Sequence, residues 1–374
     1  MDFSLTDEQE AVRESATAVF AGAVDADRVA AVEATEDRVD RELWSALAAA
    51  DLLGLAVPTE LGGGGLGLTE LCLLLEAQGA CLAPVPLWPT LVLGGLAIAR
   101  FGSPDQQARW LPAVARGEAF LSAALAEVAV RPTARPAVSA RPAGAGWVLT
   151  GHLLTVPQAH LAARVVVPAE SDAGVLLALV DPTGRGAVLE RAVTTNREVH
   201  PHLRLAEAEV AEEDVLVGPP DGAAALRWLL QAAWTGLAAL AVGVGESALE
   251  QTARHLNERE QFGRPLSTFQ GVKLKAADAA IDLEAMRVTL WQAAWRLDTG
   301  REAAEAVAVA QWQASERGQR VVHATQHLHG GLGADVSYPI HRYFLWGKQL
   351  ELMLGSPTTH LARLGRLVAA GARA

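Results

Sequence analysis

Residues 259–270 read R-E-Q-F-G-R-P-L-S-T-F-Q and separate two long apolar segments that carry a helical pattern. The first segment spans 223–258 and the second spans 270–300, and alanine, the strongest helix former, is abundant in both. Two further helical segments follow at 302–328 and 343–354. Because each of the first three exceeds ~20 residues, the C-terminal part of the chain is predicted to be a four-helix bundle.

Two other zones precede this bundle. The first shows helical periodicity, with one helix running from a capping segment at Ser4–Asp7 through Phe20 and others at 41–51, 68–82 and 105–116. The second is richer in proline, glycine and β-branched residues, and 147–149, 164–167 and 175–180 are predicted strands. The predicted fold is mainly α with a small β domain (α+β): an N-terminal helical domain at 1–118, a middle β-barrel-like domain at 119–220 and a C-terminal four-helix bundle at 221–374.

The bulk composition narrows the class of protein. The chain has 374 residues, 51% of them hydrophobic and 20% charged, which is typical of a globular protein. The formal net charge of −12 argues against a nucleic-acid partner, because phosphate binding needs clustered Lys and Arg. The longest apolar run, 232–245, is shorter than the ~20 residues of a membrane span, so no membrane span is expected.

Cysteine usage and the first residues bear on location. Cys72 and Cys81 both lie in one apolar helical run and indicate no disulfide framework, which fits a reducing compartment. The segment Met1–Ser4 has neither the basic region nor the apolar core of a signal peptide. A cytoplasmic location is therefore expected.

The segment between the two long helices carries groups that suit a nucleotide. The guanidinium of Arg259 can make forked, charge-assisted bonds to a diphosphate, and Phe262 offers a flat face to a purine. Gly263 lets the backbone approach a ligand closely, and Gln270 adds a carboxamide. The alternative is structural: Arg259 paired to Glu258 or Glu260 at a helix end, beside a core Phe262.

A glycine-rich run and a group of three histidines could suggest a phosphate site and a metal site, but the residues around them do not support either. The glycine-rich run at 62–67 is followed by no Lys-Ser/Thr pair, so a flexible connection is favoured over a phosphate-binding loop. His323, His327 and His329 have metal-ligand spacing in part, but no carboxylate or thiolate lies close to them in sequence. A metal site is therefore not expected.

Together with H-G-G-L-G at 329–333 and Y-P-I-H-R at 338–342, the 259–270 segment resembles the C-terminal half of the acyl-CoA dehydrogenase family of flavoproteins. Segments 1–15, 57–68 and 101–118 are similar to the family at corresponding places, so that the likeness covers the whole chain and is poor only in the middle zone.

The resemblance implies FAD as cofactor. It implies that Arg259, Phe262, Gly263 and Gln270, with Gly330 and Gly331, reach across a dimer interface to the FAD of the neighbouring subunit. The family's adenosine-binding Gln corresponds to His327, with Gln326 displaced by one position. Ser356 is a further candidate for cofactor binding.

The chain departs from the family where the family does its chemistry. The family's glutamate base, which removes a proton from the acyl-CoA, corresponds to Leu354, and leucine cannot accept a proton. The alternative base positions on the long helix fall near Ala233 and Trp234. The nearest carboxylate, Glu351, is interpreted as a structural partner of Arg342 or Lys348.

The middle zone departs from the family as well. The family's first flavin-contacting segment corresponds to 125–130, which lacks the family's Thr, Gly and Ser. A later contact that contains Trp in the family is replaced by L-T-V-P at 154–157. Groups that a subunit supplies to its neighbour's FAD are thus retained, whereas groups that serve its own flavin ring and substrate are lost.

The resemblance therefore implies the non-catalytic subunit of a heterotetrameric acyl-CoA dehydrogenase, like those of steroid side-chain catabolism in actinobacteria. A paralogous partner would supply the Glu base, with an acyl-CoA as substrate and an electron-transfer flavoprotein as acceptor. Two alternatives remain open. One is a self-sufficient homo-oligomeric flavoenzyme, either a dehydrogenase that uses Glu351 or Glu127 or a flavin monooxygenase. The other is a flavin-free scaffold subunit.

Overall fold

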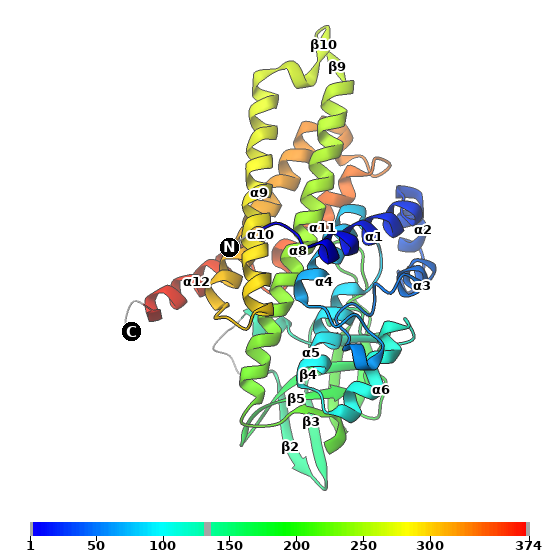
Figure 1. Ribbon diagram of the computed structural model, residues 1–374, viewed down its shortest axis with the longest axis vertical. Coiled ribbons are helices and arrows are strands. Elements are labelled where there is room, and N and C mark those ends of the chain that lie inside the picture. The colour runs from blue at the N-terminus through cyan, green and yellow to red at the C-terminus, as the bar shows by residue number, and fades with distance from the viewer. Residues whose placement is uncertain (1–2, 131–135, 372–374) are drawn as a thin grey trace. The chain divides into compact units, whose positions relative to one another are not determined.

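The protein is described here by a computed structural model that covers residues 3–130 and 136–371, and it divides into two compact units (Figure 1). The first, called the helical unit, contains residues 3–30, 72–83 and 237–371. The second, called the mixed unit, contains 31–71 together with the described part of 84–236. The predicted boundaries of three consecutive domains, at 118 and 220, stay a prediction.

The helices of the first zone begin where the sequence predicts, because side chains cap them. Helix α1 (Asp7–Ala23) starts after Thr6, whose hydroxyl accepts from the backbone of Gln9 while the Gln9 side chain accepts from Thr6 in return. Asp40 caps α3 (Arg41–Ala49), and Ser103 caps α6 (Pro104–Ala115) in the same reciprocal way as Thr6. The other elements of this zone are α2 (Ala26–Glu33), η1 (Thr59–Leu61), α4 (Leu68–Cys81) and α5 (Leu96–Phe101).

The mixed unit is built on a curled sheet of eight strands, as expected for the β domain. The strand order is β6-β7-β3-β2-β4-β5-β8, and β1 pairs in parallel with β4. The strands are β1 (Phe120–Ala123), β2 (Val138–Ala143), β3 (Gly146–Leu153), β4 (Ala162–Ser171), β5 (Gly174–Val180), β6 (Ala187–Glu190), β7 (His202–Ala211) and β8 (Val215–Val217). Inward-facing residues of β3, β4, β5 and β7 form one buried apolar cluster, which Trp147 partly covers.

Two short helical segments accompany this sheet. Helix α7 (Ala126–Val130) follows β1, and the 3-10 turn η3 (Glu212–Asp214) precedes β8. A π-helix at Trp88–Gly95, labelled η2, is buried at every position. This π-helix was not predicted, since a continuous apolar run has no period that would distinguish it from an α-helix or a strand.

The C-terminal helices confirm the predicted bundle. They are α8 (Gly222–Glu258), α9 (Gln270–Asp298), α10 (Ala304–Leu328) and α11 (Ile340–Leu352). Helix α11 begins three residues before its predicted start, and a further helix, α12 (Pro357–Gly371), was missed. Within the helical unit α10 packs against α9, α11 and α12.

Close backbone approaches hold the helical unit together. An added Cβ on Gly243 of α8 would lie 2.0 Å from the carbonyl oxygen of Glu76 on α4, so only glycine fits there. Gly347 of α11 is similar, because its added Cβ would lie 2.6 Å from a methyl group of Val322 on α10. These contacts fix the distances between helices to values that any larger side chain would prevent.

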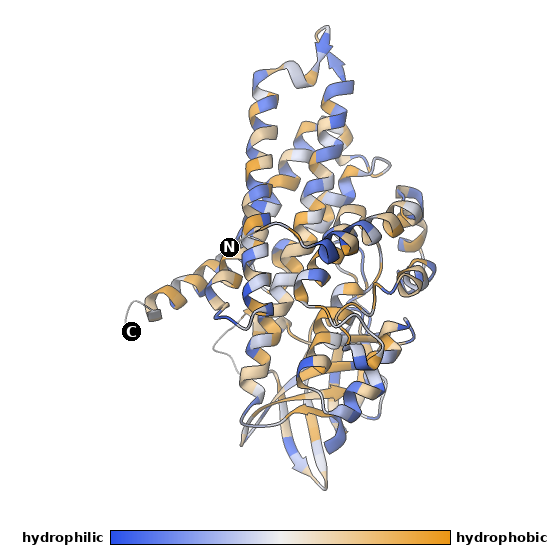
Figure 2. Ribbon diagram, viewed as in Figure 1, coloured by the Kyte–Doolittle hydropathy of each residue, from blue (hydrophilic) through white to orange (hydrophobic). Residues whose placement is uncertain are grey.

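Helix α8 changes character along its length. By length and composition it is apolar enough to cross a membrane, but 89% of its most apolar window is buried inside the protein, as in the core helix of a folded domain. Figure 2 shows hydrophilic residues at the end of α8 that leads to β9. This polar end carries the residues that the sequence analysis associated with a nucleotide.

Candidate functional site

A tight hairpin joins α8 to α9 and presents Phe262 to solvent. Strands β9 (Glu260–Gln261) and β10 (Arg264–Pro265) pair antiparallel, at the end of the two helices that Figure 1 shows uppermost. Both residues of the turn have positive φ, 56° at Phe262 and 76° at Gly263, as in the two-residue hairpin turns that favour glycine. The Phe262 side chain is 91% exposed, which contradicts the alternative that it is a core residue.

Backbone and ring contacts hold the groups beside the turn. The amide of Arg259 donates to the carbonyl of His255 at 2.8 Å, and its own carbonyl accepts from Leu266 at 2.9 Å. The guanidinium of Arg264 lies 4.1 Å from the centroid of the Phe269 ring, a cation–π contact. The side chains of Arg259 and of Gln270, the first residue of α9, are exposed. The hairpin is thus a fixed scaffold whose polar groups face outward.

The second predicted segment lies at the end of α10. The side-chain amide of Gln326 donates to the carbonyl of Gly333 at 3.0 Å and so closes the η5 turn (Gly330–Ala334). His327, the residue at the family's adenosine-binding position, is exposed. An added Cβ on Gly330 or Gly331 would meet nothing within 4 Å, so packing within this chain does not require glycine at either position. Gly330 needs positive φ (62°), and Gly331 leaves its backbone open to an approaching group.

Stacked imidazoles connect these two segments. The rings of His255 and His329 lie 4.4 Å apart between centroids with an interplanar angle of 22°. His255 stands one helical turn before Arg259, and His329 immediately precedes Gly330. The pair therefore holds the end of α8 beside the glycine turn, and it brings the two predicted segments to one end of the helical unit.

The protonation of this pair follows from its surroundings. Nδ1 of His329 lies 2.8 Å from the carbonyl of Thr325 and must donate to it, so the neutral ring carries its proton there. Nε2 of His329 is buried without a hydrogen-bond partner in the described structure. Burial lowers the pKa of both imidazoles, and for His255 the neighbouring His329 and Arg259 lower it further. This pair was not predicted, because a stack between residues far apart in sequence leaves no local signal.

The residue at the family's base position lies in the turn between α11 and α12. Leu354 is buried and has φ of 56°, a left-handed conformation that is rare for a branched side chain. Ser356 accepts a hydrogen bond from the backbone of Thr359 at 3.3 Å and so starts α12. His360 is buried in this turn, and its Nε2 lies 3.2 Å from the carbonyl of Gly355. Ser356 therefore already has a structural role, whatever it contributes to a ligand.

The two alternative carboxylates have structural partners. Glu351 forms an ion pair with Lys348 on the same face of α11. Lys348 is one of the two partners that were predicted for it. Glu127 on α7 accepts a hydrogen bond from the backbone of Leu154 at 2.5 Å. This bond also places 125–130 beside 154–157, the two segments that depart from the family's flavin-contacting pattern.

The alternative base positions on α8 lie in apolar surroundings. Trp88 of the π-helix donates its indole N–H to the carbonyl of Ala233 at 3.0 Å. Trp234 is buried, with 2% of its surface exposed. Two large indoles, those of Trp88 and Trp234, therefore lie at the alternative base positions.

The three histidines considered as metal ligands take separate roles. His323 makes an edge contact with Phe344 at 4.8 Å, His327 faces solvent, and His329 stacks on His255. Over residues 3–130 and 136–371, no three His, Cys, Asp or Glu side chains form a group that could hold a metal ion.

Comparison with known proteins identifies the class. Residues 6–118 match the acyl-CoA dehydrogenase N-terminal domain, and residues 221–369 match the acyl-CoA dehydrogenase C-terminal domain. The chain belongs to the acyl-CoA dehydrogenase family. The predicted resemblance and the predicted α+β fold are both confirmed.

Three relatives make the likeness more specific. The chain is 39% identical over 343 residues to acyl-CoA dehydrogenase FadE27 of Mycobacterium tuberculosis, a match that covers 89% of this chain and 90% of that protein. It superimposes on a variant of the Tcur3481-Tcur3483 steroid ACAD with a TM-score of 0.92 and 47% identity, covering 98% of this chain and 99% of that one. For the ChsE4-ChsE5 complex from Mycobacterium tuberculosis the TM-score is 0.93 and the identity 36%, with 99% of each chain covered.

Proposed function

We propose that this chain is the base-lacking subunit of a heteromeric acyl-CoA dehydrogenase and that it holds the ADP part of FAD at a subunit interface. One observation carries the proposal. The retained cofactor groups, Arg259 and Phe262, are exposed at one end of the helical unit, whereas the residue at the base position, Leu354, is an aliphatic side chain in a buried turn. The chain thus presents nucleotide-binding groups but has no proton acceptor at the base position.

The described groups suit the ADP part of FAD. Phe262 presents a ring face to a purine, Arg259 presents a guanidinium to a diphosphate, and the open backbone at Gly330 and Gly331 allows close approach. His327 adds an exposed imidazole that can donate to or stack on the adenosine. When bound, FAD supplies a hydride acceptor, and this chain's own contribution is to bind and orient its nucleotide end.

A stripe on α9 supports a neighbouring subunit. Leu274, Ile281 and Val288 are 58%, 64% and 44% exposed, and they stand seven residues apart, which places them along one face of the helix. Exposed apolar side chains that continue along one face mark a protein–protein contact. Because only the short turn η4 (Leu266–Thr268) and Phe269 separate the hairpin from α9, a partner packed on this stripe would also lie close to Phe262.

The partner we propose is a paralogous acyl-CoA dehydrogenase subunit that carries the Glu base. The similarity to the ChsE4-ChsE5 complex and to the Tcur3481-Tcur3483 steroid ACAD supports a heteromeric assembly and a CoA thioester from lipid or steroid catabolism as substrate. An electron-transfer flavoprotein as acceptor and a cytoplasmic location complete the proposal.

The test is co-expression of this chain with the related subunit encoded nearest to it. The purified complex should contain FAD by its absorption spectrum, and Arg259→Gln or Phe262→Ser should weaken FAD binding by about 10- to 100-fold, the value of one desolvated charge-assisted or stacking contact. Arg254→Gln is the matched control, since Arg254 is exposed one turn before the site on the same helix.

Two outcomes would contradict the proposal. If the chain purified alone holds stoichiometric FAD and oxidises acyl-CoA at the rate of the complex, it is self-sufficient. If the complex lacks a flavin spectrum, the chain is a scaffold.

An Ile281→Asp variant should separate the subunits and release FAD, because the charge would be buried in the contact on α9.

A further inference from the structure

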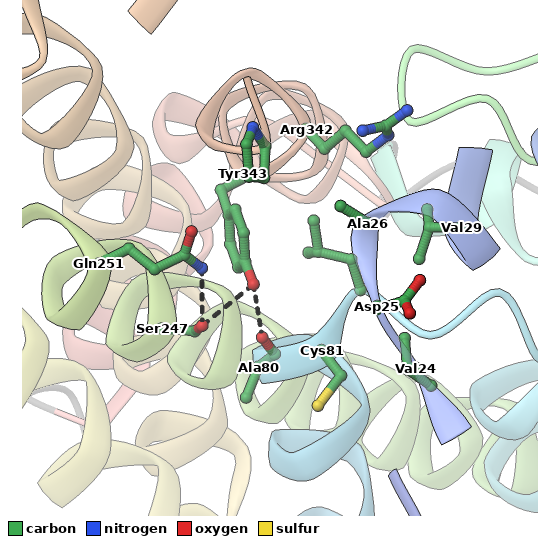
Figure 3. Close-up of a pocket in the computed structure, with 12 residues that line it drawn as sticks. Val24, Asp25, Ala26, Val29, Ala80, Cys81, Ser247, Gln251, Arg342 and Tyr343 are labelled. Atoms are coloured by element: carbon green, nitrogen blue, oxygen red, sulfur yellow. Dashed lines mark hydrogen bonds between the residues drawn. The ribbon is translucent and has the colours of Figure 1, made fainter. Parts of the chain in front are cut away.

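A cavity of about 290 Å³ lies within the helical unit, and none of the residues assigned to cofactor binding belongs to its lining (Figure 3). The connection between α1 and α2, the end of α4, one side of α8 and the start of α11 form its walls. Its volume is near the lower end of the range for small-molecule sites, about 300–1,000 Å³. It is therefore suited to a molecule smaller than a nucleotide.

A directed chain of hydrogen bonds forms one wall. The hydroxyl of Tyr343 donates to the carbonyl of Ala80 at 2.8 Å, so its oxygen accepts from the hydroxyl of Ser247 at 3.0 Å. The oxygen of Ser247 in turn accepts from the side-chain amide of Gln251 at 3.2 Å. Burial raises the pKa of Tyr343, so the phenol stays protonated and the direction of the chain is fixed. The Gln251 amide contributes to this network through its N–H group, and its side-chain carbonyl is an acceptor in the cavity lining.

Two charged side chains line the cavity, the guanidinium of Arg342 and the carboxylate of Asp25. Arg342 lines the cavity, and Figure 3 shows it on the other side of Tyr343 from Gln251. The carboxylate of Asp25 already accepts the backbone N–H of Arg28 at 2.7 Å, at the start of α2. The thiol of Cys81 is uncharged, because burial raises its pKa.

The opposite wall is apolar. Val24, Val29 and Leu82 supply aliphatic surface next to the charged and hydrogen-bonding groups. A cation, an amide and an aliphatic wall in one small cavity are complementary to a carboxylate with a short hydrocarbon chain. Arginine has five N–H donors and can bind a carboxylate in addition to its contacts within the protein.

We propose that this cavity binds a small aliphatic monocarboxylate, with its carboxylate on Arg342 and its chain along Val24, Val29 and Leu82. The negative charge of Asp25 disfavours dianions such as phosphate, and the positive charge of Arg342 disfavours amines. Because α8 and α11 both border the cavity, a bound carboxylate would stabilise their packing. The proposal does not depend on the function proposed above.

The test measures hexanoate binding to the full chain, or to the complex if the chain is isolated as one, by titration calorimetry and thermal unfolding. Affinity should rise about fourfold for each CH2 from acetate through butyrate to hexanoate. Hexanamide, the neutral isostere, should bind at least about tenfold more weakly than hexanoate, because it lacks the charge-assisted bond.

Variants separate this site from non-specific binding. Arg342→Gln should weaken hexanoate at least about tenfold. Ala26→Phe, at an exposed position of the lining, should abolish binding by filling the cavity while the unliganded fold remains, as judged by circular dichroism. Arg254→Gln, outside the cavity on α8, should leave binding unchanged. Equal binding of hexanamide and hexanoate, or full binding by both the Arg342→Gln and the Ala26→Phe chains, overturns the proposal.

Discussion

Replacing Glu351 by Gln tests whether this carboxylate acts as a proton acceptor. Glu351 is the carboxylate nearest in sequence to the family's base position, and the structure pairs it with Lys348 on α11. The side chains are 14% and 30% exposed, so the pair is mostly but not fully removed from water. If Glu351 is a structural partner only, Glu351→Gln should lower stability and leave the chemistry of the complex unchanged.

The magnitude follows from this partial burial. Exposed ion pairs contribute about 0–1 kcal/mol, whereas removing one member of a fully buried pair costs about 3–5 kcal/mol. The pair in α11 lies between these limits, so Glu351→Gln should lower the free energy of unfolding by about 1–3 kcal/mol. Much of this loss is the cost of leaving the ammonium of Lys348 half-buried without its counter-charge.

The assay combines urea unfolding with turnover of the complex at saturating acyl-CoA. Lys348→Met is the matched control, and the double variant should be more stable than the sum of the two single losses predicts, by about 1 kcal/mol. Turnover should change by less than about twofold in all three variants. A general base contributes about 10²–10⁴-fold, so a loss of turnover of that size with unchanged stability would falsify the structural role assigned to Glu351.

Further predictions concern buried titratable groups and close packing in the helical unit. Burial lowers the pKa of His360 to about 4, so the folded state binds fewer protons than the unfolded state between about pH 4 and 6.5. The free energy of unfolding should therefore fall as pH falls through this window, by at most ~1.4 kcal/mol per pH unit. His360→Gln should remove that slope in urea unfolding. Glu76 should give the opposite pH dependence, because burial raises its pKa to about 8. The free energy of unfolding of the wild type should therefore fall as pH rises from about 4.5 to 8. Glu76→Gln should be more stable than wild type at pH 8 but not at pH 4.5. Equal pH slopes in wild type and variant would contradict either assignment. Gly347→Ala, whose Cβ would meet Val322 at 2.6 Å, should lower the free energy of unfolding by about 1–3 kcal/mol. Gly365→Ala on the exposed side of α12, where a Cβ meets nothing within 4 Å, should raise it by about 0.5–1 kcal/mol, and a loss at this position would show that the helix packs on an undescribed surface.

Sequence reasoning succeeded where local residues specify local structure. The capping segment at Ser4–Asp7 predicts a helix start that the structure confirms at Thr6, since a cap satisfies backbone groups within a few residues of itself. The long apolar segments predict the bundle for a similar reason, and the 259–270 segment predicts the family. Helix α12 was missed although Ser356 and Pro357 mark its start and Leu361, Leu364 and Val368 recur with helical spacing.

By itself, then, the sequence determined the helices, the family and the loss of a carboxylate at Leu354, because each depends on which residue occupies a position. Only the tertiary structure decided which groups meet. It stacks His255 on His329, pairs Glu351 with Lys348, and leaves Phe262 in solvent while Trp234 is buried. These outcomes depend on packing between segments that are distant in sequence, or on the three-dimensional direction of a side chain, and neither is encoded in a local pattern.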